Sequence, residues 1–210
     1  MIKNVIFDVM GVVFVVGDDT NDLLVPFVNK INNTITKEKI NNLYLDASLG
    51  KITSREFWLN IGIEESEIQN IEKKYLDENL IIDSKMIDVI KLLKAKGYKI
   101  GFLSNDVSEW SNYLRKKYKL TSLLDYCVIS GDVGLRKPDE SIYNYLIQEY
   151  NVIPKESIFI DDRIKNLIPA ENLGFNTILF DRDNRYNNLS CNKINNCFEI
   201  INIIEKLDKA

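Results

Sequence analysis

Residues 5–14 read VIFDVMGVVF, an apolar run that is interrupted by one acid, Asp8, and by Gly11. Valine, isoleucine and phenylalanine favour the extended conformation and a buried surface. The run therefore predicts a buried strand from about Asn4 to Asp8. A carboxylate at the end of such a strand is costly to bury without a partner, so Asp8 is a candidate functional residue.

Four further apolar segments have the length of strands, and helical segments separate them. These expected strands are Tyr98–Leu103, Tyr126–Ser130, Ser157–Asp161 and Thr177–Phe180. Residues 83–97 are typical of the helices between them, because Met86, Ile90 and Leu93 share one face and Gly97 follows the last turn. Short apolar strands that alternate with helices predict an α/β fold, a doubly wound and mostly parallel sheet.

One segment interrupts this alternation. Between the first two strands the sequence predicts helices only, over about Asn21–Asn32, Thr36–Ala47, Thr53–Asn60 and Glu64–Asp77. We therefore expect a helical subdomain at residues 17–82, inserted into an α/β core formed by residues 1–16 and 83–210. The charged side chains Asp46, Lys51 and Arg55 of the insert are expected to face solvent.

Composition excludes several classes of function. The chain of 210 residues has a net charge of −4 with scattered basic residues, which argues against nucleic-acid binding. No apolar run reaches the roughly 18 residues of a membrane helix, and no signal peptide is evident, so we expect a cytoplasmic protein without a membrane partner. The absence of histidine excludes Ser-His-Asp and Cys-His catalysis. Cys127, Cys191 and Cys197 lack metal-ligand spacing and are expected as thiols, in preference to a Cys191–Cys197 disulfide.

Polar residues gather where the predicted strands end. They are Asp8, Ser104, Asn105, Lys137, Asp161 and Asp162. The carboxyl ends of parallel strands share one edge of the sheet, where ligands bind near the switch point of strand order. Three carboxylates there cannot all stay ionised alone, and a hard divalent cation such as Mg²⁺ prefers such oxygens as ligands. Lys137 would add positive charge, and the Ser104 hydroxyl would offer a hydrogen bond to a phosphoryl oxygen.

The order and the amino-acid sequences of four segments resemble the motifs of the haloacid dehalogenase superfamily of hydrolases. They are FDVMGVVF, FLSND, RKPDE and IFIDD, which contain Asp8, Ser104, Lys137 and Asp161–Asp162 respectively. The resemblance covers residues 1–15 and about 84–181. It implies a Rossmann-like core, and residues 17–82 stand where members of this superfamily carry a C1-type helical cap.

The resemblance also implies a role for each of these residues. Asp8 would be the nucleophile that forms an aspartyl intermediate. The Mg²⁺ ligands would be Asp8, the backbone carbonyl of Met10, Asp161 and Asp162. Ser104 would bind the phosphoryl group of a small phosphorylated substrate with help from Asn105, Lys137 would pair with the nucleophile, and Asn166 would support the acidic pair.

Met10 departs from the pattern of this superfamily. Its phosphatases usually carry a second Asp two residues after the nucleophile, which protonates the leaving group and then deprotonates water, and a thioether can do neither. General acid–base help of this kind contributes roughly 10² to 10⁴ in rate. The chain therefore resembles sugar-phosphate phosphatase-like members that lack this Asp, and a good leaving group, as in a sugar 1-phosphate or an acyl phosphate, is expected. Asp18, Asp19 or a residue of the insert is a candidate substitute.

Two alternatives stay open. A metal-independent haloacid dehalogenase needs no leaving-group proton, but such relatives usually carry a Tyr at this position and an Arg early in the cap, whereas the first Arg of this chain is Arg55. The other alternative is a catalytically silent domain that binds metal or phosphate in a regulatory role. We favour the phosphatase.

Overall fold

The computed structural model describes residues 1–186 and 192–208, and within them the strands form one six-stranded sheet. Every strand pairing in the sheet is parallel, in the order β3-β2-β1-β4-β5-β6. The strands are β1 (Asn4–Phe7), β2 (Lys99–Ser104), β3 (Tyr126–Ile129), β4 (Ser157–Asp161), β5 (Asn176–Phe180) and β6 (Lys193–Ile194). The predicted strands are confirmed to within one or two residues at their ends. The sequence did not predict β6, because two residues between asparagines give no strand periodicity.

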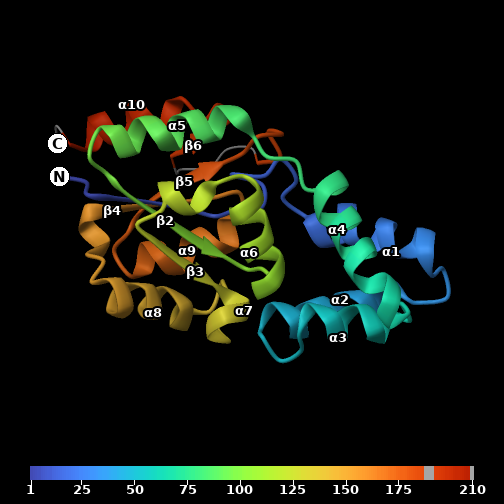
Figure 1. Ribbon diagram of the computed structural model, residues 1–210. Coiled ribbons are helices and arrows are strands. Elements are labelled where there is room, and N and C mark those ends of the chain that lie inside the picture. Colours follow the sequence, from blue (N-terminus) through green and yellow to red (C-terminus); the bar gives the residue numbers. More distant parts are fainter. Residues whose placement is uncertain (187–191, 209–210) are drawn as a thin grey trace.

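Helices cover both faces of the sheet (Figure 1). Val5 and Phe7 belong to one apolar cluster, which contains residues of α5 and α10, and Ile6 belongs to a second cluster with residues of α8 and α9. Successive strand residues point to opposite faces, so this division follows directly from the sequence. The helices of this core are α5 (Ser84–Ala95), α6 (Ser108–Lys117), α7 (Ser130–Val133), α8 (Glu140–Tyr150), α9 (Ile164–Asn172) and α10 (Glu199–Leu207). The prediction of a doubly wound α/β sheet is confirmed.

Local signals explain where α5 begins and ends. The Asp83 carboxylate accepts hydrogen bonds from the backbone N–H groups of Lys85 and Met86, which otherwise lack a partner in the first turn. After the helix, Gly97 adopts a φ of 92°, the left-handed conformation that glycine allows. The helix therefore leads directly into β2.

The segment between β1 and α5 is helical, and Figure 1 shows its helices gathered beside one end of the sheet. They are α1 (Val25–Ile31), α2 (Lys37–Ser48), α3 (Ser54–Ile61) and α4 (Ile68–Asn79), preceded by a π-helical turn at Thr20–Leu24. The expected helix from about Asn21 is thus divided in two. Pro26 has no N–H to donate to the Asp22 carbonyl, and the N–H of Val25 bonds instead to the Thr20 carbonyl, five residues back.

Aromatic side chains join these helices to the sheet layer. Trp110 of α6 lies 5.4 Å from Phe57 of α3 and 5.4 Å from Tyr75 of α4, measured between ring centroids. The indole N–H groups of Trp58 and Trp110 both donate to Oε2 of Glu72, at 2.9 and 2.7 Å. One apolar cluster therefore extends from the sheet into the inserted helices.

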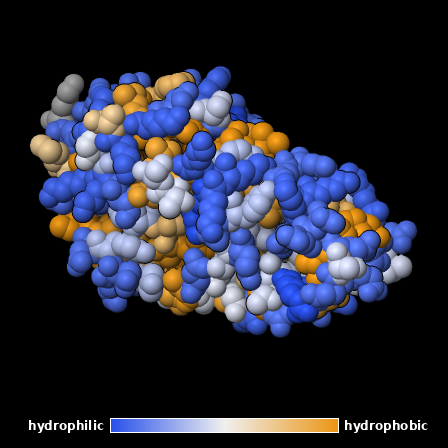
Figure 2. Space-filling model, in the orientation of Figure 1, coloured by the Kyte–Doolittle hydropathy of each residue, from blue (hydrophilic) through white to orange (hydrophobic). Residues whose placement is uncertain are grey.

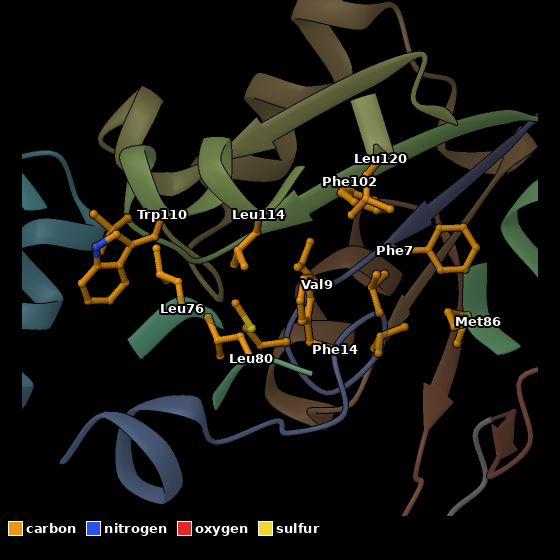
Figure 3. Packing of buried hydrophobic residues seen from close by; sticks show 14 of the residues in the cluster. Phe7, Val9, Phe14, Leu76, Leu80, Met86, Phe102, Trp110, Leu114 and Leu120 are labelled. Atoms are coloured by element: carbon orange, nitrogen blue, oxygen red, sulfur yellow. The ribbon is translucent and has the colours of Figure 1, made fainter. Parts of the chain in front are cut away.

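Figure 3 shows part of this shared core: Phe7 and Phe102 lie on the sheet, and Trp110 lies near Leu76 of α4. Polar side chains cover most of the face seen in Figure 2, with apolar side chains in small groups. Among the described residues, no helix combines the length and the apolar character that crossing a membrane requires. Cys191, one half of the less favoured disulfide, lies outside the described residues.

Candidate active site

Asp8 lies directly after β1, at the point where the strand order reverses. Chain connections run from β1 outward to β2 and β3 on one side and to β4 and β5 on the other. The Asp8 side chain is 9% exposed, and its backbone N–H donates to the Ile160 carbonyl of β4 at 2.8 Å. This is the edge of an open α/β sheet at which ligands bind.

Asp161 and Asp162 join Asp8 at this edge. One oxygen from each of the three buried carboxylates lies within 4.8 Å of the others. Both oxygens of Asp161 accept hydrogen bonds from Nδ2 of Asn166, at 3.0 Å each, so Asn166 holds this carboxylate in place. Asp162 Oδ1 is buried and has no hydrogen-bond partner within residues 1–186 and 192–208.

Lys137 supplies positive charge to the cluster. Its Nζ lies 2.7 Å from Asp8 Oδ1 and 2.7 Å from Asp161 Oδ2, and its side chain is 1% exposed. Asn105 fixes the backbone of Lys137, since its Oδ1 accepts from the Lys137 N–H and its Nδ2 donates to the Lys137 carbonyl, both at 2.9 Å. Asn105 therefore positions the lysine that pairs with Asp8.

Cationic side chains only partly offset the burial of these carboxylates: Lys137 contacts Asp8 and Asp161, and the Arg185 guanidinium lies 2.8 Å from Asp162 Oδ2. Burial raises the pKa of Asp8 to about 7; Lys137 lowers this pKa, while Asp161 and Asp162 raise it. Burial and the charge of Asp161 likewise raise the pKa of Asp162. Another cation beside these oxygens would favour the ionised form of Asp8, the form that can act as a nucleophile.

The cluster suits a hard divalent cation. Carboxylate oxygens are the ligands that Mg²⁺ prefers, and Oδ1 of Asp162 accepts no hydrogen bond from the described residues, its nearest cation being Arg163 Nε at 3.8 Å. Two glycines allow the chain to approach this carboxylate closely. A Cβ on Gly11 would lie 2.6 Å from Asp162 Cγ, and a Cβ on Gly17 would overlap Asp162 Oδ2. The residues present therefore fit a Mg²⁺ site.

A cavity of about 70 Å³ opens beside the cluster. Asp8, Asn105 and Lys137 line it from the strand ends, and Asp19 and Tyr44 line it from the inserted segment. Because one water needs about 10–15 Å³ of such space, the cavity has room for several waters or for a phosphoryl group. It is thus the candidate substrate site.

Met10 and Ser104, which were both named from the sequence, differ in their relation to this cavity. Met10 lines it together with Asp8 and is 5% exposed. Ser104 is fully buried at the end of β2 and is not among the lining residues. Its Oγ has no hydrogen-bond partner in the described part of the chain, which leaves this hydroxyl free to donate.

Six residues that line the cavity were not predicted from the sequence: Gly17, Thr20, Tyr44, Arg136, Arg163 and Lys165. Arg163 follows the acidic pair, and its guanidinium donates to the Gly17 carbonyl at 2.5 Å and lies 3.8 Å from Asp162. Arg136 precedes Lys137, so adjacency to the motif residues was a usable signal for both arginines. Tyr44 gives no such signal, because only the packing of α2 brings it to the cavity.

The charged residues of the insert that were expected to face solvent do so. Lys51 pairs with Asp46 at 3.1 Å, with side-chain exposures of 61% and 44%. Arg55 pairs with Glu65 at 2.5 Å and is 59% exposed. The solvent interpretation is confirmed for all three.

The sequence and the fold of this chain are similar to those of known proteins. A D-ribitol-5-phosphate phosphatase of Bacteroides thetaiotaomicron is 27% identical over 190 residues, which span 84% of this chain and 91% of that protein. An (S)-2-haloacid dehalogenase of Burkholderia cepacia is 33% identical, but over 45% of this chain and 41% of that protein. The solved structure of a HAD family enzyme from Bacteroides thetaiotaomicron, in complex with magnesium and inorganic phosphate, has the same fold, with a TM-score of 0.72. It is 23% identical and covers 85% of this chain and 94% of that chain.

The family model of haloacid dehalogenase-like hydrolases matches residues 2–174, which include the cluster of Asp8, Lys137, Asp161 and Asp162. The chain belongs to the haloacid dehalogenase-like hydrolases.

Proposed function

We propose that this protein is a Mg²⁺-dependent phosphatase that acts on a small phosphorylated metabolite through an aspartyl-phosphate. The observation that carries the proposal is the buried cluster of three carboxylates and Lys137 beside a polar cavity. The similarity to a D-ribitol-5-phosphate phosphatase along most of both chains supports it.

Asp8 is the nucleophile in this proposal. Its carboxylate attacks phosphorus, the bond from phosphorus to the leaving oxygen breaks, and water then releases phosphate from Asp8. Lys137 contacts Asp8 at 2.7 Å, so its charge favours the ionised nucleophile and attracts the phosphoryl group. Asn105 lines the cavity and would bind the phosphoryl group there. Ser104 is fully buried outside the cavity lining, so its unpartnered hydroxyl would bind the phosphoryl group only where this group reaches beyond the cavity.

Asp8, Asp161, Asp162 and the Met10 carbonyl would hold Mg²⁺. The metal, when bound, would neutralise charge on the phosphoryl oxygens and keep Asp8 ionised. Asn166 would hold the Asp161 carboxylate ready for it.

Residues 17–82 would be the cap of the enzyme, inserted into a core of residues 1–16 and 83–210. Asp19 and Tyr44 from this segment line the cavity, which supports a part in choosing the substrate. The polar lining favours a hydroxylated molecule such as a sugar or polyol phosphate, and acyl phosphates are the expected alternative because their leaving group needs little protonation.

Phosphate release by the purified protein tests this function. Acetyl phosphate, a sugar 1-phosphate and ribitol 5-phosphate are offered with Mg²⁺ and, separately, with a chelator. We expect phosphate release from at least one of them, and only when Mg²⁺ is present. Asp8→Asn should abolish this release. Asp46→Asn, the control that removes an exposed acid, should release phosphate as fast as the wild type.

Two results would contradict the phosphatase. Halide release from a 2-haloacid in the presence of the chelator would indicate a dehalogenase. Mg²⁺ binding without turnover of any phosphate ester or acyl phosphate would indicate a silent binding domain.

A further inference from the structure

Two neighbouring acids after Gly17 have different surroundings. The Asp18 carboxylate accepts a hydrogen bond from the Asn21 backbone N–H at 3.2 Å. It also accepts from Asn21 Nδ2, at 3.1 Å through Oδ1 and 3.0 Å through Oδ2, so Asp18 stabilises the local turn. Asp19 is 7% exposed and stands at the N-cap position of the π-helical turn, directly before Thr20, where aspartate usually accepts a backbone N–H. It makes no such bond. Its carboxylate instead accepts a hydrogen bond from the Tyr44 hydroxyl at 3.2 Å.

Asp19 reaches the space in which the phosphoryl group would react. It lines the same cavity of about 70 Å³ as Asp8 and Met10. The cavity is small, so a phosphate ester whose phosphorus lies at Asp8 would place its leaving oxygen near the other walls. Asp18 is not among the residues that line this cavity.

Titratable and charged groups surround Asp19 on several sides. They are Arg163 after β4, Arg136 before α8, Tyr44 of α2, Tyr75 of α4, Asp106 after β2, and Asp18. Burial raises the pKa of Asp19 to about 6, while Arg163 and the hydrogen bond from Tyr44 lower it. A group that must give and then take a proton works best with a pKa near the operating pH.

We propose that Asp19 is the general acid and base of this site, in the role that Met10 cannot fill. This inference rests on the proposed phosphatase function. As Asp8 attacks phosphorus, the bond to the leaving oxygen breaks and its electron pair stays on that oxygen. The protonated Asp19 donates its proton there, which releases a neutral alcohol and leaves Asp19 ionised. Asp19 then accepts a proton from the attacking water, and the bond between phosphorus and Asp8 breaks to give phosphate.

A series of substrates with different leaving groups tests this role. An alkyl phosphate needs the proton, and p-nitrophenyl phosphate needs it little. In Asp19→Asn we expect kcat to fall by roughly 10² to 10⁴ on ethyl phosphate and by less than about tenfold on p-nitrophenyl phosphate. Asp18→Asn, the matched control in the same turn, should leave both rates unchanged. Equal losses on both substrates, or a rise in KM alone, would overturn the proposal.

A second variant keeps the test decisive if Asp19→Asn folds poorly. Tyr44→Phe removes the hydrogen bond that lowers the pKa of Asp19, so this pKa rises. Because the acid must be protonated, the alkaline limb of kcat/KM on ethyl phosphate should move to higher pH. An unmoved limb would refute the role of Asp19 while the phosphatase function stands. A wild-type protein that releases no phosphate from these two substrates, nor from acetyl phosphate, a sugar 1-phosphate or ribitol 5-phosphate, would refute both.

Discussion

Replacing Lys137 with methionine tests the electrostatics of the site most sharply. Methionine has a similar length and no charge, so Lys137→Met keeps the packing and removes the ammonium group. The side chains of Lys137, Asp8 and Asp161 are 1%, 9% and 0% exposed, and both Nζ–carboxylate distances are 2.7 Å. Removing one partner of a buried pair leaves an uncompensated charge and costs about 3–5 kcal/mol. Here it leaves two such carboxylates, so we expect the free energy of unfolding to fall by about 3–5 kcal/mol at about pH 8 without divalent cations.

The loss should depend on pH. Lys137 lowers the pKa of Asp8, so its removal raises that pKa above the value of about 7. Between the pKa of the unfolded chain, about 3.9, and this raised value, the folded protein binds more protons than the unfolded chain. Stability therefore falls as pH rises, and in the variant it continues to fall beyond the pH at which the wild type levels off. The stability difference should be smaller at about pH 5 than at about pH 8.

Urea unfolding followed by tryptophan fluorescence measures this difference, because Trp58 and Trp110 are both fully buried or nearly so. Lys51→Met is the control. It removes an ion pair with side-chain exposures of 61% and 44%, and such pairs contribute about 0–1 kcal/mol. A Lys137→Met protein as stable as the wild type at about pH 8, or a loss that is the same at both pH values, would refute this reasoning.

Four further outcomes are expected. Met10→Asp should restore ethyl phosphate hydrolysis in Asp19→Asn by roughly 10²-fold and should add little to the wild type, as rate measurements would show. Mg²⁺ should raise the melting temperature more at about pH 8 than at about pH 5.5, because protons compete with the metal for the buried carboxylates. A chelator should reverse this rise, and a rise of the same size at both pH values would contradict the competition. Asn166→Ala removes two hydrogen bonds from the Asp161 carboxylate, which Lys137 still contacts, and should weaken Mg²⁺ affinity by roughly 10- to 100-fold in calorimetry. Unchanged affinity argues against this support. Glu72→Ala leaves two indole N–H groups without their acceptor, so the free energy of unfolding in urea should fall by about 2–3 kcal/mol. A change below about 0.5 kcal/mol would contradict a stabilising role for these two hydrogen bonds.

The sheet and the carboxylate cluster could be predicted because both follow from local patterns. Apolar runs of strand length are visible in one segment at a time, and parallel strands bring their carboxyl ends to one edge. Asp8 and Asp161 are 153 positions apart in the chain, yet each follows or ends such a run. That these two carboxylates lie close together can therefore be predicted without knowing how the side chains pack.

The far wall of the cavity could not be predicted in this way. Tyr44 lines it only because α2 packs where it does, and nothing in its own segment distinguishes it from other aromatic residues of the core. Asp18 and Asp19 are adjacent acids, and the division of their roles depends on a π-helical turn that Pro26 favours. Such contacts between distant segments determine which side chains of the insert reach the substrate.

In the proposed reaction Asp8 carries the phosphoryl group. Turnover of acetyl phosphate with Mg²⁺ is stopped in acid, and the peptides are weighed by mass spectrometry. We predict one added phosphoryl group on the peptide that contains Asp8, and none when a chelator replaces Mg²⁺. Rapid phosphate release with Asp8 unmodified, or undiminished release by Asp8→Asn, would contradict the account.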